Sequence, residues 1–384
     1  MRILHTSDWH VGRTIRGRSR ADEHRAALSE ITRIAADEGV DLVVVAGDLF
    51  DTAAPTAEAE RIVYRALLEL AATGADVVVV AGNHDHPRRL EAVAPLLNLA
   101  RVHTRARLAR PDEGGVVDVT ARGGEVARIA LLPFLSQRSI VTADDLMALD
   151  ADQHAGRYAE RCRQIVAALT TGFTTDTVNI VVAHLTVVGG VLGGGERQAH
   201  SIFDYVVPTQ VFPATSHYVA LGHLHRPQTI PGPCPIRYSG SPLQLDFGEA
   251  RGDKVVTIVD ATPGAPAQIR NVRLRAGRRL RTVSGTLEEL AEADFGDDYL
   301  RIVLEEPARP GLADEARARF PHAVDVTVAA AELRDDPGDW SIAGFQRSPS
   351  DLFSEYLTEI GHDDPALGTL FRQLLEEAHA SDPA

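Results

Sequence analysis

A short apolar run that ends in a carboxylate places the strongest constraint on how this chain can fold. Residues 42–46 read Leu-Val-Val-Val-Ala, and Gly47 and Asp48 follow directly. Continuous apolar, β-branched runs are typical of strands in a parallel sheet that is buried on both faces. Open α/β sheets bind their ligands just beyond the carboxyl ends of such strands. Asp48 is therefore expected at a functional site.

Four more strand-like runs end in side chains that commonly bind metal ions. Their last residues read Asp8-Trp9-His10, Gly82-Asn83-His84-Asp85, Ala183-His184 and Gly222-His223-Leu224-His225. In an extended segment, residues i and i+2 point to the same side, so Asp8 and His10 can serve one centre, as can the two histidines after Gly222. The candidate metal ligands are Asp8, His10, Asp48, Asn83, His184, His223 and His225.

This donor set favours a pair of divalent ions. Oxygen and imidazole donors without a thiolate suit Mn²⁺, Fe²⁺ or Zn²⁺. Seven candidates exceed the needs of one tetrahedral site, so two ions bridged by Asp48 are the more economical interpretation. Such a pair activates water near neutral pH and stabilises the entering and leaving oxygens of a displacement at phosphorus. The sequence therefore predicts phosphoester hydrolysis.

His84 is the expected catalytic residue. It follows the amide of Asn83 and is expected to face the substrate, stabilise the phosphoryl oxygens and protonate the leaving alkoxide. Asp51, three residues after Asp48, is expected to orient it. A hydrogen-bonded core residue is the competing interpretation of any single histidine. We prefer that interpretation for His5, His103, His217 and His322, but not for five motifs that each stand at a strand end.

The charge distribution allows a nucleic-acid partner. The chain has 384 residues and a net charge of −15, which by itself argues against binding to a phosphate backbone. However, residues 286–384 hold 23 Asp and Glu against 7 Arg, so this part carries −16 and residues 1–285 carry +1. Bound divalent ions would make the site locally positive. The loop after the first motif is expected either to line a phosphate path or to be solvated, and it contains Arg13, Arg16, Arg18 and Arg20.

We expect a cytoplasmic protein with reduced cysteines. No apolar run approaches the roughly 18 residues of a membrane span. Asp8 and His10 interrupt the only place where the apolar region of a signal peptide could lie. The two cysteines, Cys162 and Cys234, match no paired metal-ligand spacing.

The motifs resemble those of the calcineurin-like metallophosphoesterases. The resemblance is carried by Asp8-x-His10, Gly47-Asp48-x-x-Asp51, Gly82-Asn83-His84-Asp85, His184 and Gly222-His223-x-His225. Over about residues 1–260 the intervening sequence is also similar to the bacterial DNA-processing nuclease subunits of this family. Examples are His5-Thr-Ser-Asp-Trp-His10 and Arg237-Tyr-Ser-Gly-Ser-Pro242.

The resemblance implies a ligand set and an architecture. Asp8, His10, Asp48 and His225 would hold one Mn²⁺, and Asp48, Asn83, His184 and His223 would hold the other, with His84 as the catalytic histidine. The implied fold is α/β: a four-layer α/β/β/α sandwich with a small α/β capping domain and C-terminal helices. We divide the chain into a nuclease domain (residues 1–280), a capping domain (281–333) and a C-terminal helical ATPase-docking segment (334–384).

The function implied by the resemblance is that of a Mn²⁺-dependent DNA exonuclease and endonuclease. In this family, dimers of the nuclease subunit act with an SMC-like ATPase, in a heterotetramer or larger assembly, on DNA ends and hairpins in repair and recombination. Residues 350–360 and 367–378 read as amphipathic helices whose apolar faces need a partner. They are expected to dock on the ATPase, and the alternative is packing onto the capping domain.

Two other functions are compatible with the same motifs. A metallophosphatase or a cyclic-nucleotide phosphodiesterase would share all seven ligands, because those define the chemistry rather than the substrate. A catalytically inactive metal-binding scaffold would also keep them. Such a scaffold would have no need of an outward His84, so the presence of this residue favours an enzyme.

Overall fold

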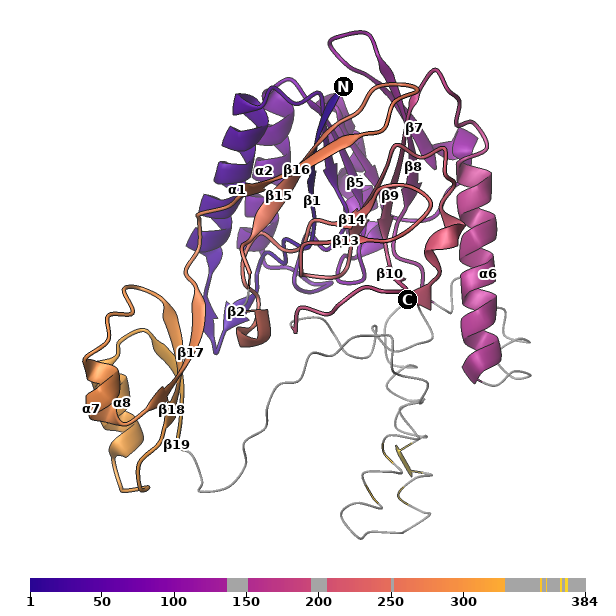
Figure 1. The fold of residues 1–384 in the computed structure, drawn as a ribbon. Coiled ribbons are helices and arrows are strands. Elements are labelled where there is room, and N and C mark those ends of the chain that lie inside the picture. Colours follow the sequence, from indigo (N-terminus) through magenta and orange to yellow (C-terminus); the bar gives the residue numbers. More distant parts are fainter. Residues whose placement is uncertain are drawn as a thin grey trace.

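Two six-stranded sheets packed face to face form the body of the molecule (Figure 1). The structure is a computed structural model that describes residues 1–136, 151–194, 206–249 and 252–328, together with the single positions 353, 357, 367, 370 and 371. Helices pack on the outer face of each sheet, which gives four layers in the order α/β/β/α. The four-layer sandwich expected from the sequence is confirmed.

The first sheet is built mostly from the N-terminal third of the chain and has the order β16-β15-β1-β4-β5-β6. The strands β1 (Arg2–Thr6), β4 (Leu42–Val45), β5 (Asp76–Val80) and β6 (Val102–Arg105) are parallel. Beside β1, the strands β15 (Val255–Asp260) and β16 (Gln268–Arg273) extend the sheet in antiparallel fashion. Its outer face is covered by α1 (Ala21–Asp37), α2 (Ala57–Ala72) and α3 (Pro87–Leu99).

Strand β4 shows how this packing directs functional residues to one edge. Val43 and Val45 belong to the core beneath the helices, whereas Leu42 and Val44 belong to the core between the two sheets. All four side chains are buried, as the continuous apolar run predicts. Because both faces of the strand are covered, polar residues find space only at its ends, and the carboxyl end leads to Asp48.

The second sheet has the order β13-β14-β12-β9-β8-β7. The strands β8 (Val126–Leu132), β9 (Val178–His184), β12 (Tyr218–Gly222) and β14 (Ile236–Tyr238) are parallel. The antiparallel strands β7 (Val116–Thr120) and β13 (Gln228–Ile230) form the two edges. Helix α6 (Ala151–Leu169) packs on the outer face through residues that include Tyr158, Cys162 and Val166.

Shorter elements connect these layers. They are the hairpin β2 (Thr14–Ile15) and β3 (Arg18–Ser19), the parallel pair β10 (Thr186–Val187) and β11 (Val206–Val207), and the 3-10 turns η1 (Pro111–Glu113), η4 (Thr209–Val211) and η5 (Phe247–Glu249). Cys162 and Cys234 are free thiols.

Residues 280–328, called the small unit below, form a three-stranded parallel sheet with two helices, shown in orange at the lower left of Figure 1. The strands are β17 (Leu280–Gly285), β18 (Tyr299–Leu304) and β19 (Ala323–Val328), and the helices are α7 (Leu287–Ala291) and α8 (Leu312–Arg319). This unit has a separate hydrophobic core that includes Leu290, Ile302 and Leu312. The domain limits at 280 and 333 stay a prediction.

The small unit contacts the body through the β2–β3 hairpin and the η5 turn. Ile15 and Phe247 pack with Leu280 and Tyr299 of the small unit. The guanidinium carbon of Arg301 lies 4.4 Å from the centre of the Phe247 ring, a cation–π arrangement. The small unit is therefore attached to two short elements of the body as well as through the chain itself.

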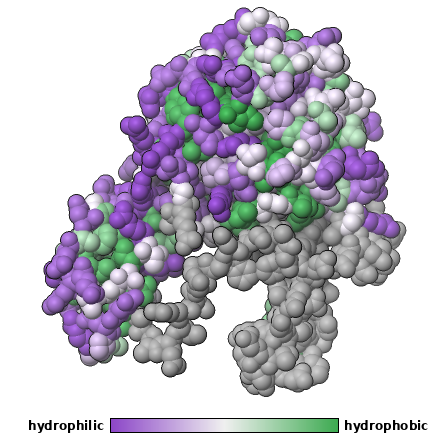
Figure 2. All heavy atoms as spheres, viewed as in Figure 1, coloured by the Kyte–Doolittle hydropathy of each residue, from purple (hydrophilic) through white to green (hydrophobic). Residues whose placement is uncertain are grey.

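The C-terminal segment expected to dock on an ATPase (334–384) lies outside the described residues, apart from five positions. These five positions are helical, and the rings of Phe353 and Phe371 stack with their centres 4.1 Å apart. Within the described part of the chain, no helix is long and apolar enough to cross a membrane. Hydrophilic residues cover much of the face shown in Figure 2, with apolar residues in separate areas.

Candidate metal centre

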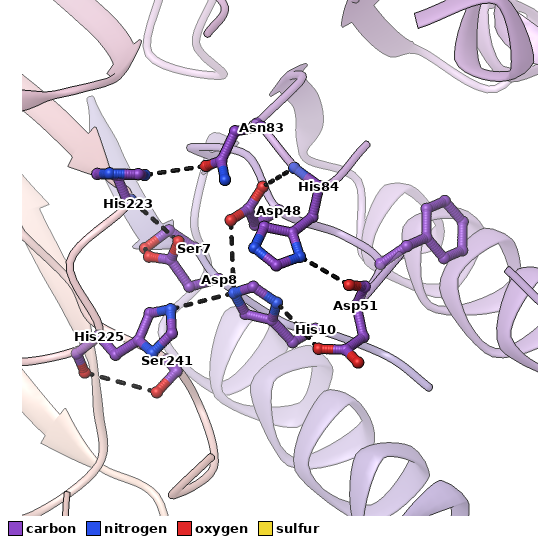
Figure 3. A network of polar contacts seen from close by, with 12 residues as sticks. Ser7, Asp8, His10, Asp48, Asp51, Asn83, His84, His223, His225 and Ser241 are labelled. Carbon is purple, nitrogen blue, oxygen red and sulfur yellow. Dashed lines mark hydrogen bonds and ion pairs between the residues drawn. The ribbon is translucent and has the colours of Figure 1, made fainter. Parts of the chain in front are cut away.

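Five strand ends meet where the two sheets face each other, and they carry all seven candidate ligands. Figure 3 labels all of these ligands except His184. Asp8 and His10 follow β1, Asp48 follows β4, and Asn83 follows β5. From the second sheet, β9 contributes its last residue, His184, and the loop after β12 contributes His223 and His225. Asp8, His10, Asp48 and His223 have φ angles of 53°, 45°, 51° and 104°. Non-glycine residues in this left-handed region concentrate at functional sites.

The donor atoms form two adjoining groups that share the surroundings of Asp48. Donor atoms of Asp8, His10 and His225 lie within 4.8 Å of one another, and so do those of Asp48, His184 and His223. Asp48 Oδ2 lies 3.4 Å from His10 Nε2 and 3.5 Å from His184 Nε2, between the two groups. This is the position that a bridging carboxylate would occupy.

Asn83 belongs to the second of these groups. Its Oδ1 atom lies 3.0 Å from His184 Nε2 and 2.9 Å from His223 Nδ1. The structure therefore brings together every residue that the sequence identified as a candidate ligand. Their roles as ligands stay a prediction.

The hydrogen bonds of the imidazole rings show that the donor set fits divalent ions. His184 Nδ1 donates to the Ala46 carbonyl oxygen at 2.7 Å, and His225 Nδ1 lies 2.9 Å from Glu249 Oε1, which can only accept. In the neutral rings the proton is therefore on Nδ1, and the lone pair is on Nε2. The Nε2 atoms of His225 and His10 lie only 3.1 Å apart. Without an ion this separation suits a hydrogen bond between the two rings, and with both protons on Nδ1 the two lone pairs would converge on a cation.

The electrostatics of the site are governed by burial and by one carboxylate–imidazole pair. Burial raises the pKa of Asp8 to about 6 and lowers the pKa of His10 to about 4. Burial opposes the ionised form of Asp48 and His184 as well, but their mutual attraction prevails. It holds the pKa of Asp48 well below its usual range and raises the pKa of His184 to about 9. A bound divalent ion would have to displace the proton from His184.

The structure gives Asp51 a different contact from the one expected. His84 Nδ1 donates to the main-chain oxygen of Asp51 at 2.6 Å, so it is the backbone, not the carboxylate, that fixes the His84 ring. The Asp51 carboxylate instead lies 3.6 Å from His10 Nδ1 and 3.4 Å from the Arg13 guanidinium. The side chain of Asp51 is therefore placed to orient His10. The catalytic roles of His84 and Asp51 stay predictions.

Close packing at two glycines holds the loops of this site together. A Cβ atom on Gly82 would lie 2.1 Å from Asp48 Oδ1, and one on Gly222 would lie 1.8 Å from the Ala46 carbonyl oxygen. Such separations are far below van der Waals contact, so only glycine allows these strand ends to approach. The absence of a side chain at Gly82 and Gly222, which precede Asn83 and His223, therefore allows the strand ends to approach closely at the site.

Sequence reasoning assigned no role to two buried carboxylates that support the site. Asp85 accepts hydrogen bonds from the backbone N–H groups of Leu49, Phe50 and Gly82, and so ties the loop after β4 to the loop after β5. Glu249 contacts the ring of His225. Asp85 was visible within its motif, but Glu249 stands 24 positions after its partner in an irregular segment.

The arginines after the first motif are engaged mostly within the chain. Arg16 pairs with Asp325, and Arg18 donates to main-chain oxygens of the small unit. Arg20 is buried and binds Glu23 and the Gln244 carbonyl oxygen. The side chain of Arg13 is 33% exposed and lies beside Asp51, so it is the member of this group placed next to the site.

Comparisons with known proteins agree with this geometry. The model of the calcineurin-like phosphoesterase family matches residues 1–227. The SbcD subunit of the nuclease SbcCD from Bacillus subtilis is 39% identical over 305 residues, which cover 78% of this chain and 76% of that protein. The proteins of the same name from Rhodobacter capsulatus and Escherichia coli K12 are 38% and 32% identical. Those matches cover 69% and 76% of this chain and 67% and 72% of the relatives.

Proposed function

The chain belongs to the calcineurin-like phosphoesterases and, within them, to the family of SbcD nuclease subunits, and we propose from this that it is a Mn²⁺-dependent DNA exonuclease and endonuclease. As a member of this family it is a metal-dependent phosphodiester hydrolase. The relatives are named as nucleases, which supports a nucleic acid as the substrate. In the proposal this substrate is DNA, with ends and hairpins as its targets in repair and recombination. The donor set is compatible with Mn²⁺.

The observation that carries the proposal is the pair of adjoining donor groups with Asp48 between them. In the proposal, one ion is held by Asp8, His10, Asp48 and His225, and the other by Asp48, Asn83, His184 and His223. Two bound ions would supply activated water and stabilise negative charge on the phosphate.

In the proposed mechanism, His84 gives a proton to the leaving oxygen. Its main-chain N–H donates to Asp48 Oδ1 at 2.9 Å, which fixes the backbone of His84 against the proposed bridging carboxylate. Its Nδ1 donates to the Asp51 carbonyl oxygen, so in the doubly protonated ring Nε2–H is the group that can give a proton to the leaving oxygen. The ring of His84 meets that of His10 edge-on at 4.6 Å between centres, which keeps it beside the first group of donors.

A comparison of substrates tests the proposal against its alternatives. We expect Mn²⁺-dependent cleavage of linear and hairpin DNA, with His84→Gln as the inactive control. Preferential hydrolysis of p-nitrophenyl phosphate or of a cyclic nucleotide would favour the phosphatase or phosphodiesterase alternative. Stoichiometric Mn²⁺ binding without hydrolysis of any of these substrates would favour the scaffold.

The proposed partners are DNA, an SMC-like ATPase and a second copy of the chain, in the cytoplasm. The relatives are named as one subunit of a larger nuclease, SbcCD, which supports a partner subunit. In the proposal this partner is an SMC-like ATPase that docks on residues 334–384. A chain truncated after Gln346 should cleave short single-stranded DNA with Mn²⁺ but no longer co-elute with the ATPase. Co-elution of the truncated chain would contradict the docking role, and its aggregation would show that the segment belongs to the fold.

Exposed leucines on two helices support the proposed homodimer. Leu96 and Leu99 of α3 are 69% and 85% exposed, and their spacing of three places them on one face of the helix. Leu68 of α2 is 45% exposed. Light scattering after chromatography should find a dimer, and Leu96→Glu combined with Leu99→Glu should shift it toward the monomer. An unchanged mass would exclude this face from the dimer.

A further inference from the structure

The η5 turn carries a buried carboxylate that contacts a proposed metal ligand without joining the ligand set. Glu249 is 5% exposed, and its Oε1 atom lies 2.9 Å from His225 Nδ1. We propose that Glu249 is a positioning residue that holds the proton of His225 on Nδ1 and so presents the Nε2 lone pair to the ion shared with Asp8 and His10. This inference rests on the two-metal site of the proposed function.

The two oxygens of Glu249 have separate partners. Within the described part of the chain, Oε1 has only His225 as a hydrogen-bond partner. Oε2 accepts from Lys254 Nζ at 2.6 Å and from the Leu245 backbone N–H at 3.1 Å. Ser241 Oγ lies 3.4 Å away and donates its proton to the Leu243 carbonyl oxygen at 2.8 Å. Two donors thus fix one oxygen, and the other is left to accept the imidazole proton. A carboxylate can accept the hydrogen bonds of Lys254 and Leu245 on one oxygen and that of the His225 ring on the other, because each of its oxygens is an acceptor.

The same surroundings hold the main chain of His225. Lys254 Nζ and the Ser241 backbone N–H each donate to the His225 carbonyl oxygen at 3.2 Å. Figure 3 shows Ser241 beside His225, with the His225 ring directed at His10. Glu249 thus contacts the ring of His225, while Lys254 and the Ser241 backbone hold its carbonyl oxygen. A carboxylate that accepts the free ring N–H of a ligating histidine sets both its tautomer and its orientation.

This geometry predicts an unusual effect of the isosteric substitution Glu249→Gln. Because Lys254 and the Leu245 backbone N–H both donate to the Oε2 position, the amide oxygen of glutamine would take that position. The NH₂ group would then face His225 Nδ1 and require a lone pair there, which moves the ring proton to Nε2. That proton would point at His10, whose Nε2 lies 3.1 Å away, and would oppose binding of the ion.

Two matched substitutions separate this effect from a general loss of stability. Lys254→Met removes a buried charge but leaves both carboxylate oxygens, so His225 keeps its acceptor. Asp118→Asn alters a carboxylate that binds Arg128 between β7 and β8, away from all proposed ligands. A purely structural role of Glu249 predicts that Lys254→Met weakens metal binding as much as Glu249→Gln does.

The experiment measures Mn²⁺ binding by calorimetry and counts bound ions by metal analysis, with the folded state of each metal-free variant checked by thermal unfolding. The wild-type chain should bind two ions. Glu249→Gln should weaken one of them by about 10–100-fold and spare the other. Asp118→Asn should bind both ions nearly as the wild type does. Lys254→Met removes a hydrogen bond to the His225 carbonyl oxygen, so it should weaken the same ion, but clearly less than Glu249→Gln does.

Nitrogen NMR of the metal-free wild-type protein with labelled histidine provides a test that needs no folded variant at position 249. The His225 ring should be protonated on Nδ1, and a proton on Nε2 would overturn the inference. So would a Glu249→Gln chain that binds both ions with wild-type affinity, or equal weakening by Glu249→Gln and Lys254→Met. A wild-type chain that binds no divalent ion would instead overturn the two-metal site itself, and this inference with it.

Discussion

The substitution Gly222→Ala tests whether the close packing of strand ends is what creates the site. Gly222 ends β12, and the added methyl carbon would lie 1.8 Å from the Ala46 carbonyl oxygen and 2.9 Å from His184 Nδ1. These two atoms are hydrogen-bonded to each other at 2.7 Å. The methyl group would therefore enter the contact that fixes the His184 ring, and would displace the backbone two residues before Asp48.

The size of the effect follows from these distances. Ordinary C···O contacts are about 3.3 Å or longer, so the carbonyl group must retreat by about 1.5 Å. Inserting a methyl group into a packed interior costs about 1–3 kcal/mol of the free energy of unfolding. A displacement of about 1 Å in an active site can reduce the rate about 100-fold, and we expect a loss of at least this size in kcat/KM.

The assay is steady-state hydrolysis of bis-p-nitrophenyl phosphate with Mn²⁺, accompanied by urea unfolding of the metal-free protein. Gly156→Ala is the matched control, because a Cβ atom there meets nothing within 4 Å. Gly156 lies within α6, so alanine should leave kcat/KM unchanged and raise the free energy of unfolding by about 0.5–1 kcal/mol. A Gly222→Ala enzyme with wild-type kcat/KM would refute the reasoning.

Three further predictions concern the residues of the site. His84→Gln should abolish hydrolysis but leave the Mn²⁺ content intact, because His84 is assigned to the transition state; loss of metal from this variant would contradict the assignment. Asp48→Asn should lower the occupancy of both ions, since a neutral amide replaces the proposed bridge, and two ions per chain by metal analysis would exclude bridging. The attraction of Asp48 overcomes burial and raises the pKa of His184 to about 9, so at pH 7 the metal-free ring holds a proton that a bound ion must displace. Mn²⁺ affinity should therefore rise with pH by up to about tenfold per unit until about pH 9, and a pH-independent dissociation constant would show that no proton is released.

The fold and the proximity of the candidate ligands could be predicted from the sequence because each motif follows an uninterrupted apolar strand. Strands buried on both faces, such as Leu42–Val45, fix where a chain can place carboxylates and imidazoles. The residues that meet at the site, from Asp8 to His225, were therefore identified before their distances were known. The parallel order of the strands then brings their carboxyl ends to a common edge.

Other features depended on information that a linear sequence does not carry. Asp51 contacts His84 through its main-chain oxygen and not through its carboxylate, and the spacing of the two residues cannot show which atom of Asp51 faces the ring. The charge of Arg20 suggested a solvated or phosphate-binding position, yet it is buried with Glu23 as its partner. Glu249 could not be linked to His225 because neither strand nor helix periodicity relates them.

The division of the ligands between the two sheets has a consequence for the synthesis of the protein. The first sheet supplies Asp8, His10, Asp48 and Asn83 from the N-terminal part of the chain, whereas His184, His223 and His225 come from the second sheet and are synthesised later. With the proposed ligands, a nascent chain that ends before His223 cannot assemble either centre fully. Because the ions would bind only the completed fold, their binding free energy would add to the stability of the fold once all ligands are in place. With these ligands, the proposed nuclease activity would arise only after most of the sandwich has been synthesised.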